Sequence, residues 1–164
     1  MNIYTINNKT EEKFLRTKTA PFDFSKFSKT EIRELVKTMR LIMIDARGIG
    51  LAANQIGLNS SVFVARNENK FYAIFNPVIT QRDGETPLLE EGCLSVPGLY
   101  GQVQRYEKVI LEGQLQNGKK TKIKAWGLLA HIFQHETDHL NGKLYIDKAK
   151  KTYPTAESER LKQK

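Results

Sequence analysis

The sequence is poor in cysteine and has no long apolar run. It holds one cysteine in 164 residues, so no disulfide can form within the chain and a disulfide-stapled secreted scaffold is excluded. The richest apolar stretch, residues 35–44, is interrupted by Lys37 and Arg40, whereas a membrane-spanning helix needs roughly 18 apolar residues. Residues 1–9 are polar and lack the apolar segment of a secretory signal. We therefore expect a cytoplasmic protein with no membrane segment.

Acidic residues are fewer than basic ones. The chain has 18 Asp and Glu against 26 Lys and Arg, a formal net charge of +8. Hydrophobic residues make up 40% and the mean hydropathy is −0.48, so the composition supports one packed core and excludes a disordered chain. Basic residues gather at 119–124 and 143–164. These runs indicate either contact with nucleic acid or a ribosome, or a solvated strand edge and a loose tail.

Hydrophobic periodicity predicts two helices. Apolar residues recur every three or four positions between residues 28 and 46, and Ser28 and Glu31 have the spacing of a capping box. A second apolar pattern runs from residue 126 to residue 140 and stops at Asn141 and Gly142. This second helix carries all three histidines of the chain, so we expect it to be central to function.

The middle of the chain is predicted to be mostly sheet. β-Branched and aromatic residues favour short strands at 62–64 and 71–75. Asn117 and Gly118 separate two further apolar runs, which predicts a β-hairpin. Because helices and strands do not alternate regularly, we predict an α+β fold in which antiparallel sheet packs around a central metal-binding helix. We place a catalytic domain at residues 1–147 and a short C-terminal tail, either a surface helix or a loose segment, at 148–164.

The second helix contains the pattern H-E-x-x-H. His135 and His139 are four residues apart, so they lie on one helical face and two imidazoles can bind one metal. Glu136 lies beside the first histidine, where its carboxylate can act as general base toward a water at the metal. The alternative is a surface helix with chance histidines. Because the chain has only 3 histidines, this spacing around a glutamate favours the metal site.

A third metal ligand must come from elsewhere. His131 lies one further turn of about 5.4 Å away along the helix, so we expect it to line the pocket rather than bind the metal. Downstream, Glu157 and Glu159 lie in the weakly patterned tail. Upstream, Cys93 would complete a site of one thiolate and two imidazoles. A buried core cysteine and a redox thiol are the alternatives for Cys93.

A glycine-rich segment, residues 48–55, ends in Gln55. It lacks the patterns of a dinucleotide-binding loop or a P-loop, so a phosphate site is unsupported. Taken alone it reads as a helix stop followed by a tight loop. The side-chain amide of Gln55 could, however, donate a hydrogen bond to a developing oxyanion, which amide hydrolysis requires.

Taken together, three segments make this sequence resemble the peptide deformylase family. The family patterns G-x-G-x-A-A-x-Q, E-G-C-L-S and Q-H-E-x-D-H stand here, complete and in order, at residues 48–55, 91–95 and 134–139. The resemblance extends more loosely from about residue 32 to residue 147. It implies hydrolysis of the N-formyl group from the N-terminal formylmethionine of nascent chains, with release of formate.

The resemblance also implies roles for individual residues. The implied ligands of one divalent metal are Cys93, His135 and His139, with iron(II) as the native ion and zinc, nickel or cobalt as replacements. Glu136 would be the general acid and base. The Gln55 side chain and the Leu94 backbone N–H would stabilise the oxyanion, and Ile49 and Gly50 would bind the substrate. The implied partner is the nascent formylmethionyl peptide. We expect the protein to be a monomer.

Helix geometry adds a prediction about the substrate pocket. Leu128, His131 and Ile132 project from the same side of the helix as His135, one and two turns earlier, so we expect them to line the site of the methionine side chain.

The chain also departs from many bacterial members of the family. These carry an acidic residue and an arginine after the cysteine motif, whereas this chain has Gly98, Leu99, Tyr100 and Gly101, so contacts beyond the methionine are expected to differ. The segment 148–164 is short, only partly basic and interrupted by Pro154, which predicts a weak or altered ribosome contact through the basic surface.

Three other functions compete with deformylation. A zinc endopeptidase would take Glu157 or Glu159 as its third ligand. An RNA- or ribosome-binding module would use the basic strands, but it leaves the H-E-x-x-H helix and Cys93 without a purpose. A deformylase-like protein without activity is opposed by the presence of both Glu136 and Gln55.

Overall fold

The computed structural model describes residues 2–86 and 88–155. Its helices are α1 (Lys9–Leu15), α2 (Lys29–Asp45) and α3 (Gly127–Leu140), with short 3-10 turns η1 (Phe24–Lys26), η2 (Ala53–Ile56) and η3 (Tyr145–Asp147). Its strands are β1 (Gly50–Ala52), β2 (Val62–Asn67), β3 (Lys70–Glu85), β4 (Leu89–Cys93), β5 (Val96–Val103), β6 (Tyr106–Gln114), β7 (Lys120–Trp126) and β8 (Lys151–Pro154). Neither α1, α2 nor α3 combines the length and the apolar character needed to cross a membrane.

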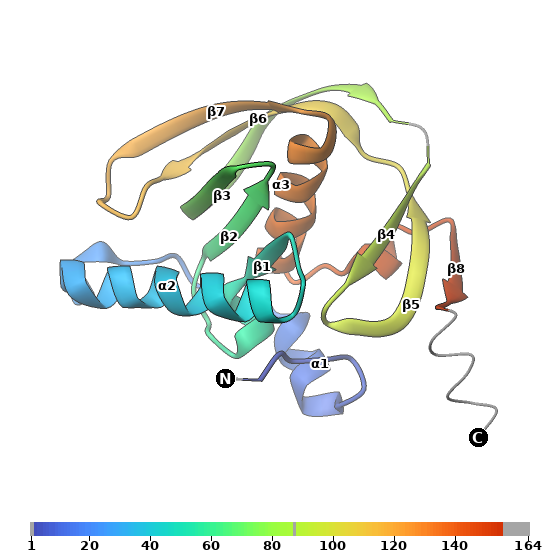
Figure 1. Cartoon of the computed structure of the whole chain (residues 1–164), viewed down its shortest axis with the longest axis horizontal. Coiled ribbons are helices and arrows are strands. Elements are labelled where there is room, and N and C mark those ends of the chain that lie inside the picture. Colours follow the sequence, from blue (N-terminus) through green and yellow to red (C-terminus); the bar gives the residue numbers. More distant parts are fainter. Residues whose placement is uncertain (1, 87, 156–164) are drawn as a thin grey trace.

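The strands form two antiparallel sheets with α3 packed between them. The larger sheet has the order β1-β2-β3-β6-β7 and the smaller one β4-β5-β8. In Figure 1 the larger sheet curves around α3, and β4 and β5 lie on the other side of the helix. The helix contacts every strand of the larger sheet. The predicted α+β fold, with antiparallel sheet around a central helix, is therefore confirmed.

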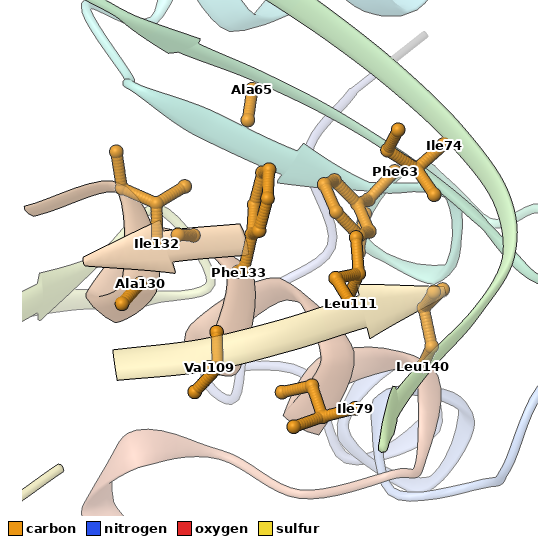
Figure 2. Close-up of a cluster of buried hydrophobic side chains, with 12 residues drawn as sticks. Phe63, Ala65, Ile74, Ile79, Val109, Leu111, Ala130, Ile132, Phe133 and Leu140 are labelled. Carbon is orange, nitrogen blue, oxygen red and sulfur yellow. The ribbon is translucent and has the colours of Figure 1, made fainter. Parts of the chain in front are cut away.

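The main core lies between α3 and the inner face of the larger sheet. Phe133 of α3 packs against Phe63, with ring centroids 5.6 Å apart. Val109 and Leu111 alternate with outward residues on β6, so both point toward the helix. Figure 2 shows this cluster, in which side chains from α3 meet side chains from the strands of the larger sheet. Burial of these apolar groups fixes α3 against the sheet and so fixes the residues that α3 carries.

A second core holds α2 against the other end of the sheet. The inward positions of α2 follow the predicted spacing of three and four, and they are Ile32, Val36, Met39 and Met43. The predicted capping box is present: the Ser28 hydroxyl accepts from the Glu31 N–H, and the Glu31 carboxylate accepts from the Ser28 N–H. The hairpin at Asn117 and Gly118 is also confirmed, because β6 and β7 pair up to Gln114 and Lys120 on either side of it.

The C-terminal tail differs from the prediction. Residues 151–154 form β8, which pairs with β5, rather than a surface helix or a loose segment. Strand β5 would otherwise leave its backbone N–H and C=O groups unpaired on this side, and β8 satisfies them. Residues 156–164, with Glu157 and Glu159, lie outside the described part of the chain. The proposed domain boundary at residue 147 falls at the end of η3, directly before this added strand.

Candidate active site

Three side chains predicted to bind metal converge at one point. The ring nitrogens Nε2 of His135 and His139 are 3.2 Å apart, and Sγ of Cys93 lies 3.1 Å from Nε2 of His139. All three donor atoms lie within 4.8 Å of one another. Because the two histidines are one turn apart on α3, the helix sets their spacing, and β4 brings Cys93 to them from the opposite sheet.

The turn between β4 and β5 holds Cys93 in place. Cys93 pairs with Val96 across the turn after a register shift at Gly92. A Cβ atom on Gly92 would lie 2.5 Å from the Tyr100 ring, so only glycine fits there. The Ser95 N–H donates to Sγ of Cys93 over 3.4 Å. Gly92 is therefore needed for close packing of the strand that carries the thiol.

The donor set fits a divalent transition metal. A thiolate and two imidazoles suit zinc, iron, cobalt or nickel, whereas magnesium and calcium prefer oxygen ligands. Burial lowers the pKa of His139 well below its ordinary value, so its imidazole is neutral, which is the form that binds a metal. Three protein ligands leave a coordination position open, as in catalytic rather than structural sites.

Glu91 organises the ligand side of the site. Its carboxylate accepts from Nδ1 of His135 over 2.9 Å and lies 2.6 Å from Nε2 of His131. An ionised carboxylate can only accept, so Nδ1 of His135 carries a proton, and Nε2 on the other side of the ring faces the donor atoms of His139 and Cys93. Sequence reasoning gave Glu91 no role of its own, although it belongs to the E-G-C-L-S motif.

Arg105 compensates the buried charge of Glu91. The two form a bidentate pair, with Nη2 of Arg105 2.8 Å from Oε2 of Glu91, and Arg105 also binds Asp138 of α3 over 2.7 Å. Burial alone would raise the pKa of Glu91, but the hydrogen bonds from Arg105 and the histidines outweigh it and hold the pKa far below its usual range. No sequence signal marked Arg105, because its partners are 14 and 33 residues away.

Glu136 lies buried beside the metal ligands. Burial raises the pKa of its carboxyl to about 7. Within residues 2–86 and 88–155, its Oε2 atom has no hydrogen-bond partner. A Cβ atom on Gly50 would lie 2.1 Å from Oε1 of Glu136, so the absence of a side chain at Gly50 makes room for the carboxylate. A buried carboxyl with a pKa near neutrality and a free oxygen is suited to exchange protons with a substrate.

Gln55 presents a fixed hydrogen-bond donor. Its Oε1 atom accepts from the Ala52 N–H over 2.8 Å, which sets the orientation of the amide. Its Nε2 atom then points toward the Ser95 hydroxyl, at 3.1 Å, and toward Sγ of Cys93, at 3.6 Å. Leu94 follows Cys93 in the same turn. The amide donor of Gln55 is therefore preorganised next to the metal ligands.

The predicted substrate residues line a single pocket of about 670 Å³. Ile49 and Gly50 form one edge, and Leu128, His131 and Ile132 of α3 contribute from the helix. Leu128 is 56% exposed at the rim, whereas Ile132 is buried. His131 also lines the pocket; it contacts Glu91 and is not part of the Cys93, His135 and His139 cluster.

The pocket has a further wall, in which sequence reasoning missed Leu89 of β4. Leu89 lines it together with Gly98, Leu99 and Tyr100 of β5, which belong to the segment already noted in the sequence. Leu89 and Tyr100 are both partly exposed. These residues form the side of the pocket that the smaller sheet contributes.

Known proteins resemble this chain both in sequence and in fold. The family model described as Polypeptide deformylase matches residues 2–154. A peptide deformylase of Thermodesulfovibrio yellowstonii is 45% identical over 123 residues, which cover 72% of this chain and 74% of that protein.

Solved structures of peptide deformylases have the same fold as this chain. A peptide deformylase from Legionella pneumophila matches with a TM-score of 0.81 at 35% identity and covers 99% of this chain and 90% of its own. A probable peptide deformylase from Synechococcus phage S-SSM7 matches with a TM-score of 0.79 at 38% identity, over 90% of this chain and 99% of its own. The chain therefore belongs to the polypeptide deformylase family.

Proposed function

We propose that this protein is a peptide deformylase that hydrolyses the N-formyl group from the N-terminal formylmethionine of newly synthesised proteins and releases formate. One observation carries the proposal: the donor atoms of Cys93, His135 and His139 lie within 4.8 Å of one another in a pocket that also holds Glu136. Family membership supports the same reaction.

Cys93, His135 and His139 would hold one divalent cation. When bound, the cation supplies a Lewis acid that polarises a carbonyl oxygen and makes water more acidic. We propose iron(II) as the native ion, with zinc, nickel or cobalt as ions that the same ligands accept. Metal analysis of enzyme purified without oxygen tests this choice.

Glu136 would move the proton in the reaction. Its carboxylate takes a proton from water, whose oxygen attacks the formyl carbon, and then delivers that proton to the amine nitrogen as the C–N bond breaks. Formate and a free N-terminal amine result. The pKa of about 7 places the carboxyl close to the working pH of a cell, where it can both accept and donate.

Gln55 and Leu94 would stabilise the oxyanion that develops on the formyl oxygen. The Nε2 donor of Gln55 is already aimed toward Cys93, and the backbone N–H of Leu94 follows in the same turn. Donors that are fixed before the reaction do not need to reorganise during it. Ile49 and Gly50 would pair with the substrate backbone, and Leu128, His131 and Ile132 would form the wall beside the methionine side chain.

Formate release from formyl-Met-Ala-Ser tests the reaction. Protein loaded with iron(II) without oxygen should release formate, Glu136→Ala should keep its metal but lose the activity, and Cys93→Ser should lose the metal. An endopeptidase that used Glu157 or Glu159 as its third ligand would keep its metal in Cys93→Ser. A metal-loaded wild-type protein that releases no formate would contradict the proposal.

We further propose that the enzyme acts in the cytoplasm as a monomer and makes only a weak contact with the ribosome through its basic surface. The mixed charge of residues 148–164, and Pro154 among them, support a weak contact. Cosedimentation with ribosomes should therefore disappear as the salt concentration rises.

A further inference from the structure

Basic side chains and the single tryptophan of the chain lie on the outer face of the larger sheet. Along β7 the exposed positions alternate as Lys120, Lys122, Lys124 and Trp126, whereas Ala125 between them is buried toward α3. Figure 1 shows α3 on the concave side of this sheet. The row therefore faces away from the helix that carries the metal ligands.

Neighbouring strands extend this row into a groove. Lys108 of β6 lies opposite Trp126, and Ile110 lies opposite Lys124. Gln81 and Asp83 of β3, which pair with Ile110 and Lys108, line the same groove, whose volume is about 560 Å³. It shares no lining residue with the candidate active site. The groove is therefore a separate surface with Trp126 as part of its wall.

The groove carries positive charge that the described residues leave uncompensated. Lys108 lies 3.8 Å from Asp83, and Lys122 lies 3.0 Å from Glu112. Within residues 2–86 and 88–155, Lys120 and Lys124 of the row on β7 take part in no ion pair. The surface is thus complementary to an anion.

Lysines on an edge strand have a simpler explanation, because they prevent pairing with another chain. That explanation does not account for Trp126, which is 69% exposed. A large aromatic ring left in water beside unpaired cations is the combination that binds single-stranded nucleic acid, where bases stack on the ring and cations hold the phosphates. A duplex hides its base faces and does not offer this contact.

We propose that this groove and the row of lysines beside it bind single-stranded RNA, with a base stacked on Trp126 and backbone phosphates held by Lys120 and Lys124. The choice of RNA over DNA rests on the proposed function, because chains being synthesised emerge beside RNA. The binding itself follows from the groove and is independent of deformylation.

Trp126 provides the direct test, because it is the only tryptophan in the chain. Titration of the metal-loaded protein with a 12-nucleotide oligouridylate should quench its fluorescence. A fluorescein-labelled form of the same RNA gives affinities for variants by anisotropy. Trp126→Ala should weaken binding about fivefold or more, as expected for loss of one stacked base. Trp126→Phe, which keeps a ring, should lose less.

Charge variants separate the groove from the general positive charge of the protein. Lys120→Glu with Lys124→Glu should weaken binding and reduce the slope of log affinity against log salt by about 1.4, at about 0.7 per phosphate contact of a single strand. The matched control is Lys29→Glu with Arg33→Glu on α2, which changes the net charge equally and should leave affinity nearly unchanged. Formate release by every variant should stay at the wild-type level, so the two proposals fail independently.

Four outcomes would overturn the RNA proposal. One is absence of quenching, and another is loss of affinity in the α2 control that equals the loss in the groove variant. A third is equally tight binding of duplex RNA or of single-stranded DNA of matching sequence. The last is tighter binding of polyglutamate, which would make an acidic protein segment the occupant.

Discussion

Glu91 of β4 connects Arg105 and helix α3 through one carboxylate. It accepts from His135 and Arg105 and contacts His131, and its side chain is 3% exposed. Replacing Glu91 with Gln keeps the shape of the side chain but removes the charge that orients His135. We expect metal affinity to fall about 10- to 100-fold, as for other partners of metal-binding histidines.

Competition with a chelator measures that affinity. Glu90→Gln, one position earlier and exposed, is the matched control and should bind metal normally. Because breaking a buried ion pair also costs stability, thermal unfolding establishes that Glu91→Gln is folded before metal affinities are compared. Unchanged affinity in folded Glu91→Gln would restrict Glu91 to a structural role.

Gly50 makes space for Glu136. A Cβ atom at this position would lie 2.1 Å from Oε1 of Glu136, so Gly50→Ala should displace the carboxylate. We expect kcat to fall about 100-fold or more, the range of general acid–base catalysis, while metal content stays normal. Gly48→Ala is the control, since its Cβ would come no closer than 3.0 Å to another atom, the tip of the Leu94 side chain. Normal kcat in Gly50→Ala would show that Glu136 relaxes freely.

Leu128 lies at the pocket rim, 56% exposed. Leu128→Trp should narrow the entrance and raise KM for formyl-methionyl peptides, with metal content intact. Steady-state kinetics and metal analysis measure both quantities. An unchanged KM would remove Leu128 from the methionine site.

At the residue scale, the sequence identifies groups whose partners are near in sequence. The spacing of His135 and His139 follows from helix geometry, so their convergence on one point, with Glu136 beside them, could be predicted directly. The prediction that Cys93 joins the two histidines depended on the family resemblance, because the residues around Cys93 are equally compatible with a core cysteine. Arg105 could not be predicted, since a lone arginine looks the same whether it is solvated or buried against Glu91.

Helix α2 begins at a capping box whose contribution can be measured. The Ser28 hydroxyl accepts from the Glu31 N–H, so Ser28→Ala should lower the free energy of unfolding by about 1 kcal/mol. Thr30→Ala, in the same turn but outside the box, should change it by less than about 0.5 kcal/mol. Denaturant unfolding measures both variants, and equal effects would assign no special role to the box.

At the element scale, the helices and the hairpin with strong local sequence signals could be predicted. Caps and periodicity predicted α2 and α3, and Asn117 with Gly118 predicted the hairpin. Strand β8 had no such signal, because Lys151–Pro154 is short and pairs only once β5 is in place. Helix α1 is likewise only seven residues long and was not predicted.

On the scale of the whole molecule, the metal site ties the two sheets together. Cys93 belongs to the smaller sheet, whereas α3 packs on the larger one. No sequence pattern reports how two sheets are placed, so this arrangement became visible only in the structure. A ligand that binds only the folded state stabilises it by about 4 kcal/mol at a thousandfold excess over Kd.

Metal removal should therefore lower the thermal stability of the protein. For a chain of this size we expect chelation to reduce Tm by about 10 °C, at about 2–4 °C per kcal/mol. Differential scanning calorimetry measures the shift. Cys93→Ser, which lacks a ligand, should show little response to the chelator, and an equal response would point to a second metal site.

The position of α3 also constrains how the protein is made. Strands β1 to β7 precede α3 in the chain, and the inner face of the larger sheet packs on that helix. During synthesis this face therefore has no partner until residues 127–140 have left the ribosome. The same segment carries His135, Glu136 and His139, so the step that completes the core also completes the reactive site. Before residues 127–140 emerge, the partly synthesised chain would be both prone to aggregation and inactive. Packing of α3 would remove both conditions in one step.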